Sequence, residues 1–262
     1  ISASKVFSLG IPSLDGVFGD GLPPGSVLLV EEDWPRSAVN QASLLAKAFL
    51  AEGVQCEQPT LLVSRDYEEA EILDSLPAFS TETVTEESPS AEKMKIAWRY
   101  KHLTSDEMRS TSVKKGQYDF GRKIGAAVAR KHVQYGQSLP KGKFKRVAVI
   151  GFGSPYWNES ELIRDMLSLR RYAVEQQAVV LVTAPVYCLP TSTTTALRHL
   201  ATAAIAIDTV DARPFKQHCD AFLRLVKPPG LLKPVIPECT VLCIKWRRRR
   251  MQVEPFHLPP ED

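Results

Sequence analysis

Residues 21–49 read GLPPGSVLLVEEDWPRSAVNQASLLAKAF and contain the signals of a strand, a connecting loop and a helix in succession. The apolar run Val27–Val30 is too short and too rich in branched side chains for a helix, so it predicts a buried strand. A helical pattern of apolar residues over 38–52 follows at once, and Gly53 is a residue type that often closes a helix. This order is typical of the phosphate-binding unit of nucleotide-binding α/β proteins.

The connecting loop, residues 31–37, lacks the chemistry that a phosphate-binding loop needs. Such loops read G-x-x-x-x-G-K-[ST], because glycines let backbone N–H groups surround the phosphates while the lysine balances their charge. If Arg36 and Ser37 replace the lysine and the hydroxyl residue, Val30 and Pro35 stand where the glycines belong. This degenerate nucleotide loop comprises Glu31, Glu32, Asp33, Trp34, Pro35, Arg36 and Ser37, and its three carboxylates would repel a triphosphate. It favours an ordinary strand–helix connection with Ser37 as the helix N-cap.

Composition places the chain among globular α/β proteins and excludes some classes of function. Its 262 residues are 44% hydrophobic and 24% charged, which suits one large domain. Lys and Arg number 33 against 30 Asp and Glu, so the net charge of +3 excludes a polycationic chain that coats nucleic acid. No apolar run is long enough to cross a bilayer and no secretory signal pattern is present, so we expect a soluble intracellular protein without membrane contact.

The remaining patterns predict an α/β fold with a mostly parallel central sheet flanked by helices and antiparallel strands at its C-terminal edge. Buried parallel strands are expected at 27–30, 60–64, 146–151 and 178–183, helices at 38–52, 122–133 and 159–176, and edge strands at 203–208, 221–226 and 240–245. The lead-in 1–24 contains a helical turn at 13–18, and flexible loops are expected at 76–95 and 134–145. We expect residues 1–262 to form one domain.

The residues at two positions, 66 and 151, indicate whether the chain can hydrolyse nucleotides. Asp66 and Glu69 follow the second strand at the spacing of a helix capping box, although a carboxylate here can also activate water. Gly151 ends the third strand where an active ATPase has an aspartate that orients magnesium. The sequence therefore predicts no hydrolysis by this chain. The alternative is an ATPase in which Asp66 is the base and Arg36 replaces the lysine.

Three segments contain candidate contacts to RNA or to a neighbouring subunit. Lys95 and Arg99 lie among the aromatic residues of 94–100, which either stack on bases or pack inside the protein. Thr191 and Ser192 belong to a loop expected at 186–195, whose hydroxyls either bind phosphate or face solvent. Arg247, Arg248, Arg249 and Arg250 stand at a predicted hairpin turn, where they either protect a sheet edge or contact phosphates.

The five cysteines predict thiols in a reducing compartment. They are Cys56, Cys188, Cys219, Cys239 and Cys243, an odd number without a second pair at zinc spacing. Cys239 and Cys243 are expected on one face of a strand as buried thiols. The five histidines form no metal-binding pattern, so no metal site is predicted.

Five segments together resemble the Elongator complex protein 4 family: 10–33, MKIAWRY at 94–100, VAVIGFGSP at 147–155, LVTAP at 181–185 and EPFHLPPE at 254–261. The resemblance implies a RecA-like fold with degenerate Walker motifs. It implies a hetero-hexameric ring with two copies each of the fourth, fifth and sixth Elongator subunits, which docks on the catalytic Elongator subunits and binds tRNA. It further implies that the whole complex carries out carboxymethyl-type modification of the wobble uridine U34, with ATP at subunit interfaces of the ring and residence in cytoplasm and nucleus. Together with the missing lysine and strand-end aspartate, this favours a non-catalytic accessory role for this chain.

Overall fold

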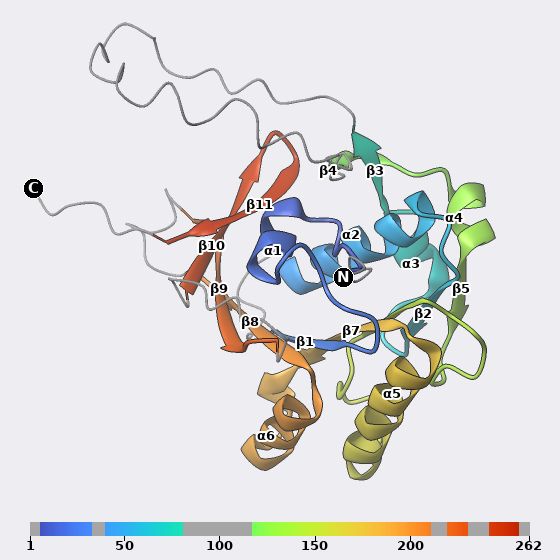
Figure 1. The fold of residues 1–262 in the computed structure, drawn as a ribbon, viewed down its shortest axis with the longest axis vertical. Coiled ribbons are helices and arrows are strands. Elements are labelled where there is room, and N and C mark those ends of the chain that lie inside the picture. The colour runs from blue at the N-terminus through green and yellow to red at the C-terminus, as the bar shows by residue number, and fades with distance from the viewer. Residues whose placement is uncertain (1–5, 33–39, 81–116, 211–218, 230–240, 257–262) are drawn as a thin grey trace, which may run out of the picture.

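The computed structural model describes residues 6–32, 40–80, 117–210, 219–229 and 241–256 (Figure 1). In these residues a nine-stranded sheet has the order β11-β10-β9-β8-β1-β7-β6-β2-β5. Its strands are β1 (Val27–Glu32), β2 (Thr60–Ser64), β5 (Val133–Gly136), β6 (Arg146–Ile150), β7 (Val179–Pro185), β8 (Ala203–Thr209), β9 (Ala221–Lys227), β10 (Val241–Arg247) and β11 (Arg250–Pro255). The strands from β8 to β5 pair in parallel, while β9, β10 and β11 are antiparallel additions. The expected mostly parallel sheet with an antiparallel C-terminal edge is confirmed.

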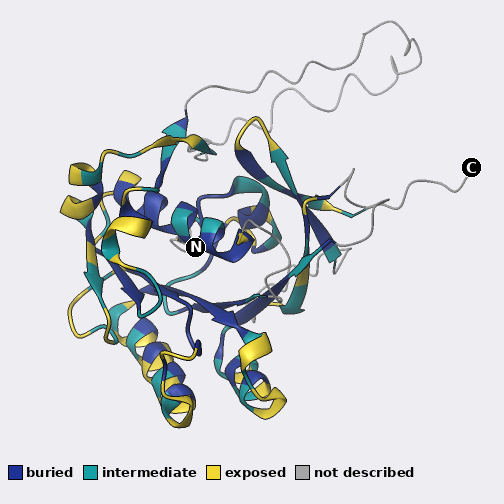
Figure 2. Cartoon of the chain, turned by 180° about the vertical axis from the view of Figure 1, so that it is seen from behind, coloured by how far each residue is buried: buried dark blue, intermediate teal, exposed yellow. Residues whose placement is uncertain are grey.

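Helices cover both faces of the sheet. They are α1 (Pro12–Val17), α2 (Gln41–Gln55), α3 (Glu69–Leu73), α4 (Ala126–His132), α5 (Leu162–Gln176) and α6 (Thr191–Leu200), with short 3-10 turns at Glu159–Glu161 and Val186–Cys188. Helices α5 and α6 lie on one face, and α1 and α2 lie on the other (Figure 1). The inner sides of α5 and α6 are buried and their outer sides exposed (Figure 2).

Two hydrophobic clusters separate the two faces because side chains alternate along a strand. In β1, Val27 and Leu29 belong to the cluster under α5 and α6, while Leu28 and Val30 belong to the cluster under α1 and α2. Burial on both faces explains why β1, β2, β6 and β7 are continuous apolar runs that sequence alone identifies.

The lead-in before β1 is part of the core. Phe7 pairs with Leu22 in an isolated antiparallel bridge, and α1 confirms the expected helical turn. Six apolar side chains of this segment are buried in the cluster beside α2: Phe7, Leu9, Ile11, Leu14, Phe18 and Leu22. The buried guanidinium of Arg146 on β6 donates to the carbonyl of Ser8 at 2.8 Å, which fixes the lead-in to the sheet.

Several expected boundaries were wrong. Helix α2 begins at Gln41, and its N-cap is Asn40, whose side chain accepts from the N–H of Ser43; Ser37 lies outside the described residues. Gly53 lies inside α2, where it gives room to Thr60 and Arg146, since a Cβ would collide with both. The helix ends at Gln55, with Cys56 as its C-cap.

The expected positions of the capping box after β2 and of the helix at 122–133 were also wrong. Glu71 of α3 accepts from the backbone N–H of Glu68, so the capping box starts two residues after Asp66. The helix expected at 122–133 is α4, which is shorter because β4 (Gln117–Lys123) includes residues 122 and 123.

Short elements replace parts of the expected loops. Strand β3 (Pro77–Ser80) pairs with β4, and β5 begins the stretch that was expected as the loop 134–145. Residues 81–95 of the other expected loop lie outside the described residues. Residues 191–200 form α6, which turns the connection from β7 to β8 into a helical crossover. Because of this crossover β8 runs parallel to β1, and its assignment as an antiparallel edge strand was wrong.

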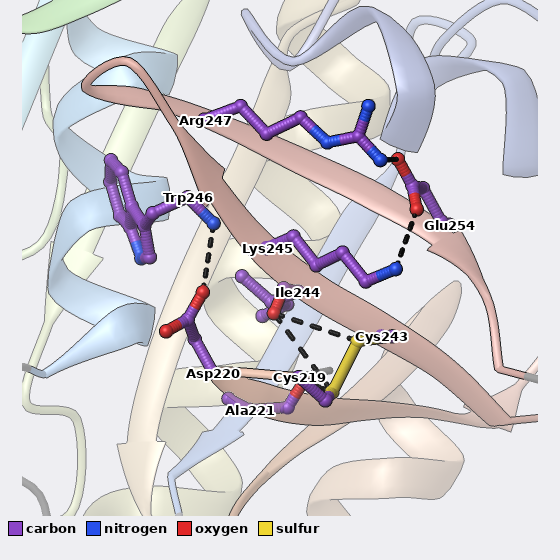
Figure 3. The surroundings of a disulfide bond; sticks show 9 residues. All are labelled: Cys219, Asp220, Ala221, Cys243, Ile244, Lys245, Trp246, Arg247 and Glu254. Carbon is purple, nitrogen blue, oxygen red and sulfur yellow. Dashed lines mark hydrogen bonds and ion pairs between the residues drawn. A yellow bond between two sulfur atoms is a disulfide. The ribbon is translucent and has the colours of Figure 1, made fainter. Parts of the chain in front are cut away.

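The absence of disulfides was a wrong expectation. Cys219 and Cys243 form a disulfide, with their Cα atoms 5.5 Å apart (Figure 3). They come together because the pairing of β9 with β10 brings Cys219, two residues before β9, beside Cys243 on β10, 24 positions later in the sequence. Cys56 and Cys188 are exposed free cysteines, and Cys239 lies outside the described residues.

Candidate functional site

The carboxyl ends of four neighbouring strands meet at one edge of the sheet. In spatial order they belong to β1, β7, β6 and β2. The polar side chains found there are Glu31 and Glu32 on β1, Thr183 on β7, Ser154 after β6 and Asp66 after β2, and Gly151 follows β6 directly. Ligands of open α/β sheets bind at such edges, which makes this edge a candidate site.

Glu31 on β1 forms an ion pair with Arg198 on α6. Its carboxylate is 2% exposed and accepts two hydrogen bonds from the guanidinium of Arg198 on α6, with the Nη2–Oε2 pair at 2.7 Å. This bidentate ion pair ties β1 to α6 and compensates the buried charge. Glu31 is therefore committed to the fold, although the sequence placed it in the degenerate nucleotide loop.

Glu32 lies at the entrance to that loop. Burial raises the pKa of its carboxyl, while hydrogen bonds from Thr183 and Asn40 oppose this rise. The Asn40 Nδ2 atom donates to Glu32 Oε2 at 2.9 Å, so the residues on either side of 33–39 are bonded directly to each other. Asp33, Trp34, Arg36 and Ser37 lie outside the described residues.

Asp66 occupies the space beside Gly151. The Ser154 hydroxyl donates to Asp66 Oδ1 at 2.6 Å, and a Cβ on Gly151 would overlap the other carboxylate oxygen. Gly151 has φ of +75°, a conformation that favours glycine. Burial raises the pKa of Asp66, and the hydrogen bond from Ser154 opposes this rise. The carboxylate beside Gly151 thus belongs to Asp66, in the segment after β2. An aspartate at position 151, after β6, would fit only if Asp66 moved.

Electrostatics at this edge oppose a bound triphosphate. Burial raises the pKa of the Cys188 thiol, and the negative charges of Asp66 and Glu32 raise it further. Arg198 is engaged by Glu31, and Arg65 lies over the ring of Trp157 with 4.2 Å between its guanidinium carbon and the ring centroid. The described part of this edge thus presents carboxylates where a phosphate site needs cations.

Metal binding and membrane insertion receive no support from the described residues. Among them, no group of three or more His, Cys, Asp or Glu side chains is arranged to hold a metal ion. Within the same ranges no helix combines the length and the apolar character that crossing a membrane requires.

Thr191 and Ser192 are exposed at the first turn of α6, whose N-cap is Pro190. The expectation of a loop was wrong from Thr191 onward, because the buried side chains of Thr194 and Leu197 pack the segment as a helix. Lys95 and Arg99 lie outside the described residues.

The four arginines near the C-terminus have three different environments. Arg250 is buried, and its guanidinium donates to Ser80 Oγ at 2.7 Å and to Gln117 Oε1 at 2.9 Å. Arg247 pairs with Glu254 at 2.9 Å. Arg248 and Arg249 form the exposed two-residue turn of the β10–β11 hairpin, which confirms the predicted hairpin. These two therefore present their charge to solvent.

Sequence reasoning missed Asn40, Thr183, Ser154 and Arg198. Thr183 has a visible signal, since it is a polar residue near the end of an apolar strand and accepts from the N–H of Gly151. Arg198 has none, because its partner lies 167 positions away.

Comparison with known proteins gives the family. The PAXNEB protein family matches residues 1–126 and 122–262, which cover the whole chain. The chain belongs to the PAXNEB family. It is 25% identical to Elongator complex protein 4 of Xenopus laevis over 97% of this chain and 80% of that protein. With the protein of the same name from Dictyostelium discoideum it shares 24% identity over 100% of this chain and 76% of the relative.

The human protein named Elongator complex protein 4 matches a shorter part of this chain at higher identity. Identity reaches 33%, over 51% of this chain and 34% of that protein. The resemblance drawn from the five sequence segments is confirmed by these relatives. This PAXNEB chain has a RecA-like arrangement, in which the strand before the nucleotide loop, β1, is separated from β6 by one intervening strand, β7.

Proposed function

We propose that this chain is a non-catalytic accessory subunit of the Elongator complex. The single observation that carries the proposal is similarity over nearly the whole chain to several proteins named Elongator complex protein 4. A match of this extent includes the strands of the central sheet, its edge strands and the loops that connect them.

In the finer form of the proposal, the chain assembles with the fifth and sixth Elongator subunits into a hetero-hexameric ring with two copies of each. The ring docks on the catalytic subunits, binds tRNA and supports carboxymethyl-type modification of wobble uridine in the cytoplasm and nucleus. The exposed arginines Arg248 and Arg249 support a role in binding RNA, because exposed cations supply most of the affinity for a phosphate backbone. ATP binds between subunits of the ring.

The non-catalytic character of the chain is supported at the carboxyl edge of the sheet. Glu31 is committed to Arg198, Glu32 is bonded to the helix N-cap Asn40, and Asp66 fills the space that an aspartate at position 151 would need. Phosphoryl transfer depends on cations and a metal placed around the phosphates. The described residues here provide carboxylates instead.

Removal and replacement of the chain in cells test the proposal. Without the chain, mass spectrometry of tRNA should show loss of carboxymethyl-type uridines, and the wild-type chain should restore them. Asp66→Asn should restore them as well, since this carboxylate performs no chemistry in the proposal. Unchanged modification in the absence of the chain, or failure of the tagged chain to purify with the fifth and sixth subunits, would refute the proposal.

The alternative is an ATPase active in its own right, with Asp66 as the base and Arg36 in place of the lysine. One observation favours it: Asp66 lies at the carboxyl edge with a raised pKa, as a general base does. ATP turnover by the isolated chain separates the two functions. Turnover that disappears in Asp66→Ala would establish the ATPase, whereas turnover that is absent or unaffected by this substitution excludes it.

A further inference from the structure

An open pocket of about 460 Å³ lies between the start of α2, strand β4 and the β10–β11 hairpin. Its apolar wall consists of Leu44, Phe120 and Trp246, and its polar lining consists of Gln41, Asp220 and Arg249. The pocket is separate from Glu32, Asp66 and Gly151, which do not line it.

The aromatic wall is fixed in place by hydrogen bonds. Trp246 and Phe120 meet edge to face, with ring centroids 5.0 Å apart. The Trp246 Nε1 atom donates to Gln41 Oε1 at 3.1 Å, and its backbone N–H donates to Asp220 Oδ2 at 2.8 Å. Figure 3 shows the Trp246 ring on the side of β10 opposite to Lys245 and Arg247. These contacts hold the wall in position before a ligand arrives. Trp246 is only partly buried, so a ligand can reach it.

Arg249 borders this wall because position 121 has no side chain. The aliphatic stem and guanidinium of Arg249 lie over Gly121, where a Cβ would overlap them. The backbone N–H of Phe120 donates to the carbonyl of Arg249 at 2.9 Å, which fixes the hairpin turn to β4. A cation is thus held directly beside the apolar wall.

The hairpin turn is unfavourable for the residues that occupy it. Arg248 and Arg249 have φ of 48° and 69°, and they form a two-residue loop between the paired residues Arg247 and Arg250. Such loops favour Asn-Gly, because both positions need a left-handed backbone. Residues held in an unfavourable backbone conformation are enriched at functional sites, so two arginines here point to a role for their charge.

We infer that this pocket binds one unpaired nucleotide of an RNA strand, with the base against Trp246 and Phe120 and the backbone phosphate at Arg248 and Arg249. The inference rests on the proposed tRNA-binding function and names a site for it. Aromatic side chains stack on any base, and arginines track the phosphates of single strands.

The charge distribution selects this occupant over others. The carboxylate of Asp220 lines the pocket itself, where it accepts hydrogen bonds from an uncharged base and repels a carboxylate or a polyphosphate. The amide of Gln41 adds a second group that can bond to a base edge. The arginines lie at the hairpin turn, where a phosphodiester leaves the pocket. A neutral base with an external phosphate matches this arrangement.

Binding measurements on the assembled ring of this chain with the fifth and sixth subunits test the inference. The probes are full-length tRNA and an oligouridine that contains one 4-thiouridine for photo-cross-linking. Trp246→Leu should weaken the affinity for both probes about tenfold, since it removes one stacking surface. Cross-links in the wild type should map to the segments around Phe120 and Trp246.

A second variant separates function from folding. Arg248→Asn combined with Arg249→Gly gives the turn its preferred residues, so the chain should melt at a higher temperature. It should still bind RNA more weakly, with the slope of log affinity against log salt reduced by about 1.4 for two lost contacts. Arg170→Gln with Arg171→Gln removes the same charge from the exposed side of α5 and should leave both probes bound as in the wild type.

The outcomes distinguish this inference from the function on which it rests. A ring that binds tRNA normally with both pocket variants, or cross-links elsewhere, overturns the pocket and leaves the tRNA role intact. A ring that binds no RNA overturns both. Displacement of the oligouridine from the pocket by ATP, or weaker ring assembly in Trp246→Leu with unchanged RNA affinity, assigns the pocket to a different occupant and also overturns the inference. If Trp246→Leu does not fold, the arginine variant decides.

Discussion

Gly151 and Asp66 share a single space at the carboxyl edge of the sheet. The carboxylate of Asp66 lies where a side chain on residue 151 would begin, and the left-handed backbone of Gly151 favours glycine independently. Each residue therefore limits what the other position can be. The hydrogen bond from Ser154 holds Asp66 in this arrangement.

Gly151→Asp should destabilise the chain by about 2–4 kcal/mol, because it combines a strained φ with two carboxylates in contact. Urea unfolding measures this. Adding Asp66→Gly should recover part of the loss, which a double-mutant cycle detects as coupling. Gly125→Asp, at a position with free space and negative φ, is the control and should change stability by less than about 0.5 kcal/mol. A small effect of Gly151→Asp would show that Asp66 moves aside easily.

The buried Asp15 should make stability depend on pH. Burial raises its pKa to about 6, while hydrogen bonds from Leu9 and Ser8 oppose the rise. Because the folded-state pKa exceeds the ordinary value of 3.8, the contribution to stability is full below 3.8 and is lost as pH rises through about 6. The loss amounts to roughly 2–3 kcal/mol.

Asp15→Asn tests this contribution, since an amide does not titrate in this range. Urea unfolding between about pH 4 and pH 7 should show a smaller decline for the variant than for the wild type. Ser8→Ala is a useful control, because it removes one bond to the carboxylate and leaves the titrating group. Parallel pH profiles for Asp15→Asn and the wild type would contradict the assignment.

Elements differ in how well the sequence predicts them. The strands β2 and β7 were predicted well because residues buried on both faces leave a continuous apolar run. Helix α6 was missed because its hydroxyl-rich start, TSTTT, has the composition of a loop. Its helical form depends on packing and on Arg198, which reaches Glu31 on β1. Local patterns cannot show a partner that distant.

The disulfide between Cys219 and Cys243 links the segment just before β9 to β10. Its removal in Cys219→Ser with Cys243→Ser should lower stability by about 3.5 kcal/mol, the value expected for a closed loop with a separation of 24 residues. Denaturation with and without reductant measures this. Cys56→Ser changes an exposed free cysteine and should have little effect. Equal stability of the double variant and the oxidised wild type would show that the bond does not constrain the unfolded chain.

At the scale of the whole molecule, two local clusters of opposite charge are present among the described residues. The carboxylates of Glu31, Glu32 and Asp66 gather at the edge formed by β1, β6 and β2, while the exposed Arg248 and Arg249 lie at the β10–β11 turn, and the net charge of +3 reveals neither cluster. The sequence predicted both regions from residue types. It could not predict that Arg250 is buried or that Trp246 and Phe120 share a pocket, because these contacts join distant segments.

Mg-ATP at about 5 mM should leave the melting temperature of the isolated chain unchanged within about 1 °C, since a ligand stabilises only in proportion to its binding to the folded state. Differential scanning calorimetry measures this. A rise of several degrees that disappears in Asp66→Ala would mean that the carboxyl edge binds nucleotide despite its charge.

The shared space of Gly151 and Asp66 also bears on how such a site is lost or regained over generations. Because the two side chains compete for one space, Asp66 and an aspartate at position 151 exclude each other in this packing. A route that carries both acidic side chains passes through the least stable form, whereas a route that loses Asp66 first avoids it. The packing at this edge therefore sets the order in which the two substitutions can be gained.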